Sequence, residues 1–220
     1  MNVRMQKIAE LVKKDSITAD IGTDHAYLPV LLVEKGICRK VYACDIGEGP
    51  LKSAYETVHE HGLEENIELI LSDGFDHVPD DIDCAVIAGM GYYTAAEILD
   101  KAAERLPSLK QIIVEVNRNV EMMRRWISDH HFTITNEIAV EDRGFDYIVI
   151  VFNTEYHETL TEEEILCGPV LKRNMDESYI RYVNRRIRMI DEILKVSRKE
   201  ERNKELRKER SVWQNILEER

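Results

Sequence analysis

The stretch ITADIGTDHAYLPVLLVE, residues 17–34, decides the fold. It predicts a short apolar strand over 17–21, a turn at Gly22-Thr23-Asp24 and a helix over 27–34. A strand that turns through glycine directly into a helix is the first half of a strand–helix–strand unit. Such units build a parallel sheet with right-handed crossovers.

The same alternation continues along the chain. A helix is expected over 3–14, and further strands and helices are expected over 40–45, 51–61, 67–71, 84–88, 94–105, 111–116 and 120–130. Two last strands, 132–140 and 147–153, are separated only by a turn at Arg143-Gly144. This ending predicts a hairpin and one antiparallel strand in an otherwise parallel sheet. The expected fold class is therefore α/β, with a Rossmann-like sheet of seven strands.

A second unit is expected after residue 160. Thr161 and Glu164 form a capping box that opens a short helix, and Gly168-Pro169 marks a break. Apolar residues then recur at alternating spacings of three and four, as in a heptad seam, at Ile180, Val183, Ile187, Ile190 and Leu194. The seam fails over 197–203 and resumes beyond it. We predict a Rossmann-like domain over 1–160 and an antiparallel helical coiled-coil hairpin within 161–220.

The charge is divided unevenly between these parts. Residues 1–169 hold 15 Lys and Arg against 32 Asp and Glu, whereas residues 170–210 hold 14 against 8. An acidic body repels phosphates and a basic tail attracts them, so the tail is a candidate RNA-binding surface. Helical spacing places four of its cations on one stripe: Arg181, Arg185, Arg188 and Lys195. On charge alone, a solvated coiled-coil surface is an equal alternative.

Membrane, secretory and metal-binding classes find no support in the sequence. No apolar run is long enough to cross a bilayer, and no apolar segment follows the first basic residues as in a signal peptide. The four cysteines lack the spacing of a zinc or redox site, and the histidines suggest no metal site. We therefore expect a cytoplasmic protein without a metal.

Small or acidic residues stand at four of the expected strand ends. They are Asp20, Gly22 and Asp24, then Asp45 with Ile46, then Asp73-Gly74, and finally Gly89-Met90-Gly91. In a doubly wound sheet, ligands bind outside the carboxyl ends of the strands. The four segments therefore predict a ligand site along one edge of the sheet.

The chemistry of these segments suits S-adenosylmethionine. Gly22 permits a tight turn, Asp20 can bind an ammonium, and Asp45 can accept hydrogen bonds from two ribose hydroxyls. Asp73 can accept from an adenine amino group, and Gly89-Met90-Gly91 would pass close to the sulfonium. NAD is the rival ligand, but the later glycines of its GxGxxG motif are replaced here by Asp24 and Tyr27. An aspartate repels a pyrophosphate and attracts a sulfonium, which favours S-adenosylmethionine.

The run DIGTDHAYLP, residues 20–29, resembles the signature of the bacterial family that methylates N1 of adenine 22 in tRNA. Similar matches occur at Arg4-Met5-Gln6, Gly49-Pro50, Asp73-Gly74, 88–91 and Gly168-Pro169. The family combines a seven-stranded methyltransferase sheet with a C-terminal coiled coil. The resemblance implies that Asp24 and His25 lie at the methyl-transfer centre, together with Asn117, and that Arg4 faces the RNA. It also implies a set of cofactor-binding residues: Asp20, Gly22, Asp45, Asp73, Gly74, Gly89 and Met90.

The chain also departs from the family pattern. Tyr92 replaces a glycine, Val-Glu-Val-Asn at 114–117 replaces Leu-Gln-Pro-Asn, and a Lys-x-Tyr-Glu run is not preserved near 143–147. A methyltransferase of another RNA, of DNA or of a small molecule therefore stays open, as does an RNA-binding paralogue without activity. Glu115 could favour a base that becomes cationic, or it could be solvated. The aromatic candidates for stacking on the target base are Tyr92, Tyr93 and Phe145. A heptad seam can close within one chain or between two, so the oligomeric state is open.

Overall fold

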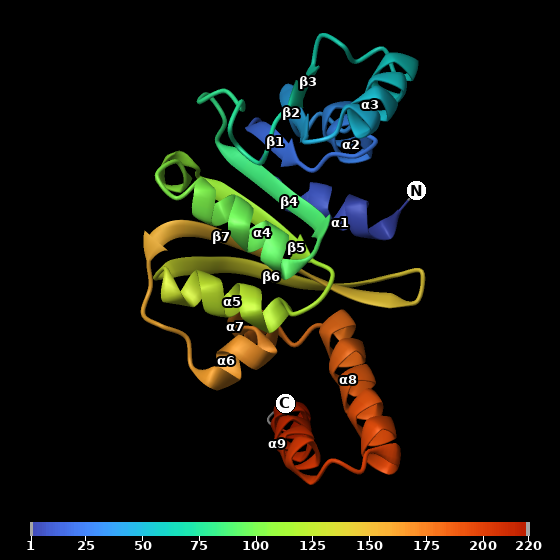
Figure 1. The fold of residues 1–220 in the computed structure, drawn as a ribbon, viewed down its shortest axis with the longest axis vertical. Coiled ribbons are helices and arrows are strands. Elements are labelled where there is room, and N and C mark those ends of the chain that lie inside the picture. Colours follow the sequence, from blue (N-terminus) through green and yellow to red (C-terminus); the bar gives the residue numbers. More distant parts are fainter. Residues whose placement is uncertain (1, 219–220) are drawn as a thin grey trace.

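The structure is a computed structural model that describes residues 2–218. Seven strands form one sheet in the order β3-β2-β1-β4-β5-β7-β6 (Figure 1). The strands are β1 (Ile17–Ile21), β2 (Lys40–Asp45), β3 (Ile67–Leu71), β4 (Cys84–Met90), β5 (Gln111–Val116), β6 (Phe132–Asp142) and β7 (Phe145–Tyr156). β7 runs antiparallel to both β5 and β6, whereas β1 to β5 pair in parallel. The predicted fold class, with its terminal hairpin, is confirmed.

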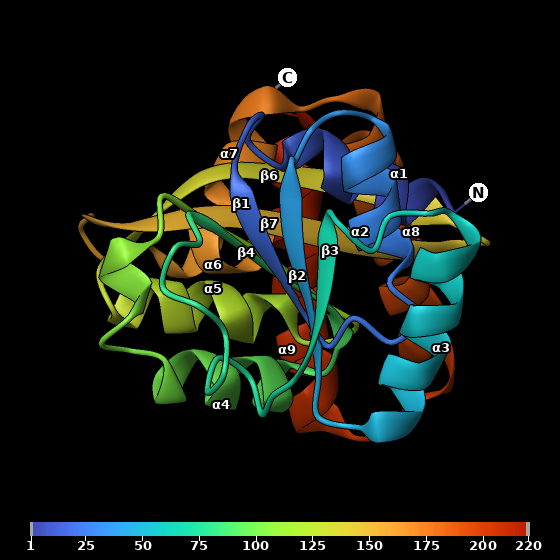
Figure 2. The same ribbon diagram turned by 90° about the horizontal axis from the view of Figure 1, so that it is seen from above.

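Helices cover both faces of the sheet (Figure 2). One face carries α1 (Val3–Leu11), α2 (Tyr27–Glu34) and α3 (Glu48–Glu60), and the other carries α4 (Tyr92–Lys101) and α5 (Val120–Asp129). β4 contributes side chains to the hydrophobic clusters on both faces of the sheet. Val86 packs in the cluster with α1, α2 and α3, whereas Ala85 and Ile87 pack in the cluster with α4 and α5. Successive side chains of a strand point to opposite faces, so a strand covered on both sides is apolar throughout.

The tail holds four helices: α6 (Glu162–Cys167), α7 (Pro169–Asn174), α8 (Glu177–Val196) and α9 (Glu200–Glu218). The capping box of Thr161 and Glu164 is present at the start of α6. α8 and α9 pack antiparallel, because Tyr182 meets the ring of Trp213 and Arg186 pairs with Glu209 at 2.6 Å. Two packed helices are therefore confirmed, and their coiled-coil character stays a prediction.

A buried ion pair joins the tail to the sheet. Arg124 on α5 pairs with Glu137 on β6 at 2.7 Å, and both side chains are almost fully buried. Arg124 also donates to the carbonyl of Ile165, and Glu137 accepts from the amide of Val170. α6 and α7 are thereby held against α5 and β6, and a domain boundary at residue 161 stays a prediction.

Several helix boundaries differ from the sequence prediction. α3 starts at Glu48 and not at residue 51. Pro50 lies in the first turn of α3, where the backbone amides need no partner within the helix. α1 ends at Leu11 because Val12 is already extended toward β1. α4 starts at Tyr92, two residues before its predicted start.

Candidate functional site

The turn after β1 requires a glycine. Gly22 has a φ of +80°, and its amide and that of Thr23 both donate to the carbonyl of Cys44, at 2.8 and 2.9 Å. A Cβ added at Gly22 would lie 3.0 Å from the terminal methyl of Met90. The structure therefore brings together the ends of β1, β2 and β4, as the sequence predicted.

Asp20 is a buried carboxylate at the end of β1. Its side chain accepts a 2.7 Å hydrogen bond from the hydroxyl of Thr23. Burial raises the pKa of Asp20 to about 6, the Thr23 hydrogen bond opposes this rise, and the charge of Asp45 adds to it. No Lys or Arg within residues 2–218 forms an ion pair with Asp20. A ligand ammonium would supply the missing positive partner, so the site fits a cationic amino acid moiety.

Asp45 connects the loops that follow β1 and β2. Its carboxylate accepts from the amide of Asp24 at 3.2 Å and from the amide of Gly47 at 2.9 Å. Ile46, beside it, is 71% exposed. An exposed apolar side chain next to a fixed carboxylate can cover a nucleoside while the carboxylate meets the ribose hydroxyls.

Asp24 and His25 come together on the loop before α2. Asp24 has a left-handed backbone, its side chain is 71% exposed, and its carboxylate lies 3.6 Å from Nε2 of His25. The ring of His25 stacks on Tyr27 at 5.3 Å between centroids. Ala26, the residue that precedes α2, offers no side-chain cap, so the first amides of α2 are available to a carboxylate.

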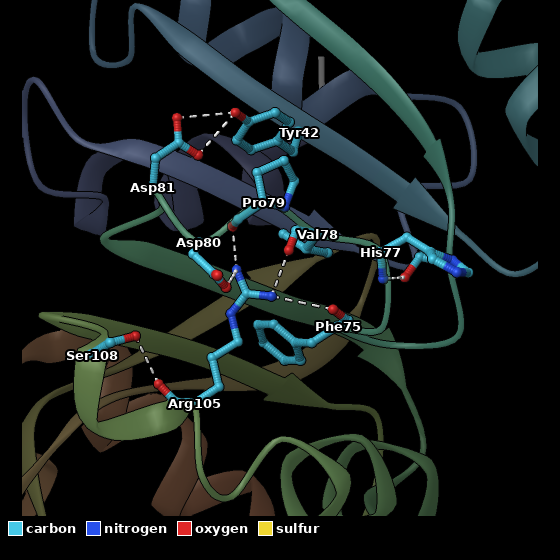
Figure 3. A network of polar contacts seen from close by, with 10 residues as sticks. Tyr42, Phe75, His77, Val78, Pro79, Asp80, Asp81, Arg105 and Ser108 are labelled. Carbon is cyan, nitrogen blue, oxygen red and sulfur yellow. Dashed lines mark hydrogen bonds and ion pairs between the residues drawn. The ribbon is translucent and has the colours of Figure 1, made fainter.

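The loop after β3 is held by a residue that the sequence did not reveal. Arg105 donates to the carbonyls of Phe75 at 3.2 Å, Val78 at 2.6 Å and Pro79 (Figure 3). Its guanidinium also lies 5.7 Å from the centre of the Phe75 ring. No local motif links an arginine after α4 to carbonyls about thirty residues earlier. This loop directly follows Asp73-Gly74, so Arg105 fixes the wall of the predicted adenine site.

Asp73 and Gly74 lie where they were expected, at the end of β3. Asp73 is about half exposed and pairs with Lys101 at 3.0 Å. Gly74 has a φ of +59°, and a Cβ there would lie 3.2 Å from Ile98 on α4. Gly74 therefore allows the loop to pack closely on α4 while Asp73 faces solvent.

The turn Gly89-Met90-Gly91 is held from β5. Gly89, with a φ of +81°, lies at a bulge between β4 and β5. Its amide donates to Glu115 at 3.1 Å, and its carbonyl accepts from the side chain of Asn117 at 2.9 Å. Asn117 is therefore placed beside the turn that was predicted to border the sulfonium.

Glu115 is fully buried, which excludes the alternative that it is solvated. Arg4 on α1 pairs with it at 2.9 Å and lies over the ring of Tyr147 at 4.6 Å. Burial raises the pKa of Glu115, and the charge of Arg4 opposes this rise. Arg4 therefore reaches the floor of the site, and the contact with RNA that was predicted for it stays a prediction.

Three cations of the predicted α8 stripe already have acidic partners. Arg181 lies 3.8 Å from Glu177, Lys195 lies 2.6 Å from Glu192, and Arg185 pairs with both Glu141 and Asp146. Arg188 has no ion-pair partner within residues 2–218. A second group of exposed cations without such partners surrounds one hollow at the start of α9: Arg198, Lys204, Arg207 and Lys208.

Metal-binding clusters and membrane-spanning helices are both missing from the part of the chain that the structure describes. Among residues 2–218, no three His, Cys, Asp or Glu side chains are grouped so that they could hold a metal ion. No helix in the same range has the length and apolar character that a membrane crossing requires.

The chain resembles known tRNA methyltransferases along most of its length. The family model of tRNA (adenine(22)-N(1))-methyltransferase matches residues 18–218. The Bacillus subtilis enzyme of that name is 28% identical over 187 residues, which are 82% of this chain and 79% of the relative. The residues that the family model matches include both the sheet and the helical tail.

Solved structures show the same likeness. The Streptococcus pneumoniae protein Sp1610 in complex with S-adenosyl-L-methionine has a TM-score of 0.88 at 28% identity, over 97% of this chain and 98% of that one. M. capricolum TrmK in complex with S-adenosyl-homocysteine has a TM-score of 0.84 at 30% identity, over 99% and 98%. The chain therefore belongs to the tRNA (adenine(22)-N(1))-methyltransferase family, and its reaction is methyl transfer to N1 of an adenine in tRNA.

Proposed function

We propose that this chain transfers the methyl group of S-adenosylmethionine to N1 of adenine 22 in tRNA, at the edge where β1 to β5 end. The observation that carries this assignment is Asp20, a buried carboxylate without a cationic partner at the centre of that edge. Solved relatives of the same family hold S-adenosyl-L-methionine or its product. A tRNA substrate also favours a cytoplasmic location.

Each strand end has one task in binding the methyl donor. Asp20 binds the ammonium, and the first amides of α2 receive the carboxylate. Asp45 and Ile46 hold the ribose, and Asp73 and Gly74 hold the adenine. Gly89, Met90 and Gly91 lie beside the sulfonium, which supplies an electrophilic methyl group when the cofactor is bound.

The target base needs positioning more than it needs proton transfer. N1 of adenine has a lone pair in the plane of the ring, so no base has to remove a proton before N1 attacks. Unstacking the adenine costs on the order of a few kcal/mol. Alignment at the site returns roughly 7–11 kcal/mol through proximity. Asp24 is suited to hold the base and to stabilise N1 as it becomes cationic, with His25 and Asn117 beside it.

The tail supplies contacts to the phosphates. The cations around the hollow of α9 are better placed for this role than the α8 stripe, because they have no acidic partners within the described chain. A cation that is already paired must break that pair before it can bind a phosphate. We therefore assign the main phosphate contacts to Arg198, Lys204, Arg207 and Lys208, with Arg188 as a further candidate.

Incubation of labelled cofactor with unmodified tRNA tests the activity directly. Mapping of the labelled nucleotide should give 1-methyladenine at position 22. A label elsewhere would exclude the proposed position. No label, together with no calorimetric binding of S-adenosylmethionine, would favour a paralogue without activity.

The variant Asp24→Ala tests the assigned centre. It should keep its affinity for S-adenosylmethionine within a few-fold and lose about 100-fold or more in turnover. Asp129→Ala removes an exposed aspartate at the end of α5 and serves as the matched control. Normal turnover of Asp24→Ala would remove Asp24 from the mechanism.

A further inference from the structure

A cavity of about 430 Å³ lies between the sheet domain and the tail. Three segments form its walls: the loop that joins β5 to α5, the tip of the β6–β7 hairpin, and the middle of α8. The lining side chains include Asn117, Arg118, Phe145, Arg185, Arg186 and Met189.

The cavity adjoins the methyl-transfer centre on the side of the tail. Asn117 lines it and also donates to the carbonyl of Gly89 at 2.9 Å. α8 forms the opposite wall and leads on to α9. An RNA that is held by α9 and inserts a base beside Gly89 therefore passes this cavity.

The walls are suited to a nucleotide. Phe145 lines the cavity and is nevertheless 68% exposed, so its ring is open to a planar partner. Arg118 is exposed, and its side chain has no hydrogen-bond or ion-pair partner within residues 2–218. Arg186 pairs with Glu209, but its Nε is buried without a hydrogen-bond partner. An open aromatic ring beside unused guanidinium donors is the combination that binds an unpaired base and its phosphate.

Ion pairs between α8 and the hairpin shape the cavity. Arg185 on α8 pairs with Asp146 at 3.1 Å and with Glu141 at 3.0 Å, on the two strands of the hairpin. Its guanidinium also reaches the carbonyl of Gly144 at 3.5 Å. These contacts neutralise Asp146 and fix the hairpin tip against α8. The lining has two carboxylates, Asp146 and Glu121. Of these, only Glu121 forms no ion pair with another residue among 2–218.

We propose that this cavity binds the nucleotide next to the target adenine, with its base on Phe145 and its phosphate on Arg118. This inference rests on the proposed tRNA substrate. It adds a subsite that keeps the strand open beside the extruded base, and it gives Arg185 a role in shaping the cavity.

Fluorescence of 2-aminopurine tests the proposal. Two tRNAs carry this base at position 21 or at position 23, and each is titrated with the full-length protein and S-adenosyl-homocysteine. The emission of one of them should change on binding to the wild type, because stacking on an aromatic ring alters it. Phe145→Ala should abolish the change and raise the KM for tRNA about 10-fold. Phe145→Tyr should keep both properties.

Matched variants separate this effect from general damage. Tyr156→Ala removes another exposed aromatic of β7, outside the cavity lining, and should behave as the wild type. Arg118→Gln should reduce the slope of log affinity against log salt by about one, and Arg118→Lys should restore it. The affinity for S-adenosylmethionine should stay unchanged in all of these variants.

The possible outcomes are distinct. A wild type that methylates tRNA while neither labelled tRNA responds, or while Phe145→Ala responds as the wild type does, overturns the subsite alone. A wild type that binds the cofactor and methylates no tRNA overturns the proposed function instead.

Discussion

Asp20 makes cofactor binding sensitive to pH. Burial raises its pKa to about 6, so below that pH the carboxyl is protonated before the cofactor arrives. The ammonium binds the ionised form, and binding at low pH must therefore expel a proton. We expect the affinity for S-adenosylmethionine to fall by up to about tenfold per pH unit below pH 6. Calorimetric titration between pH 5 and pH 8 measures this effect.

Asp20→Asn is the control for that titration. It should bind S-adenosylmethionine weakly and with little dependence on pH over the same range, because the amide does not ionise. If the variant keeps the pH dependence of the wild type, another group is responsible for it.

Single residues were predictable where topology alone places them. Asp20, Asp45 and Gly89 lie at the ends of parallel strands. Such ends meet at one edge of a sheet, and this follows from the topology without knowledge of the side-chain contacts. Glu115 and Arg105 were not predictable in the same way. The partner of Glu115 is 111 positions away on α1, and no periodic pattern links the two residues.

The junction between α6 and α7 depends on Gly168. Its φ is +83°, and a Cβ there would lie 2.7 Å from Arg124 and 2.8 Å from Glu137, the buried ion pair. Gly168→Ala should therefore lower the free energy of unfolding by at least about 3 kcal/mol, from backbone strain and from disruption of the pair. In a chain of this size the melting temperature should fall by roughly 6–12 °C.

Gly36→Ala is the control that has the backbone strain without the steric clash. Gly36 has a similar φ of +63°, but a Cβ there would meet nothing within 4 Å. This control should lose only about 1 kcal/mol in the free energy of unfolding. Equal losses in the two variants would mean that the ion pair does not resist the added methyl group.

The bounds of a strand were predicted correctly where the buried apolar run ends at the same residue as the strand. β1, β2, β3 and β5 have the predicted bounds, because their apolar runs end at polar or charged residues or at a glycine. β6 and β7 are longer than predicted, since their pairing continues to the two-residue turn at Arg143-Gly144. α7 was not predicted, because its six residues follow Gly168 too closely to show a helical period.

The whole molecule should bind tRNA mainly through α9. Replacement of Arg198, Lys204, Arg207 and Lys208 by alanine should weaken tRNA binding and make it less dependent on salt. The slope of log affinity against log salt should fall by roughly one for each phosphate that these side chains bind in the wild type. The affinity for S-adenosylmethionine should not change. Filter binding at several salt concentrations measures the slope.

Paired cations of α8 provide the matched control. Arg181 and Lys195 are also exposed, but both have acidic partners on the same helix. Their replacement by alanine should change the slope little. A larger decrease of the slope in this control than in the α9 variant would return the main contact to α8.

Charge asymmetry points to the tail as the part that meets RNA, which stays a prediction, and it does not say which helix face would do so. Charge counts follow from composition, whereas the pairing of Arg185 with Asp146 depends on how α8 lies against the hairpin. The heptad seam predicted that α8 packs on another helix, but it did not identify that helix. Apolar spacing defines a face, and in this structure α8 and α9 cover each other.

Trp213 and Ile216 of α9 belong to the same hydrophobic cluster as Ile87 of the central strand. During synthesis on the ribosome, the part of that cluster beside α8 can be covered only after Trp213 and Ile216 have emerged. A chain truncated before Trp213 would expose apolar surface of α8 to chaperones and proteases. The helix that we expect to bind the tRNA thus also covers part of the hydrophobic interior.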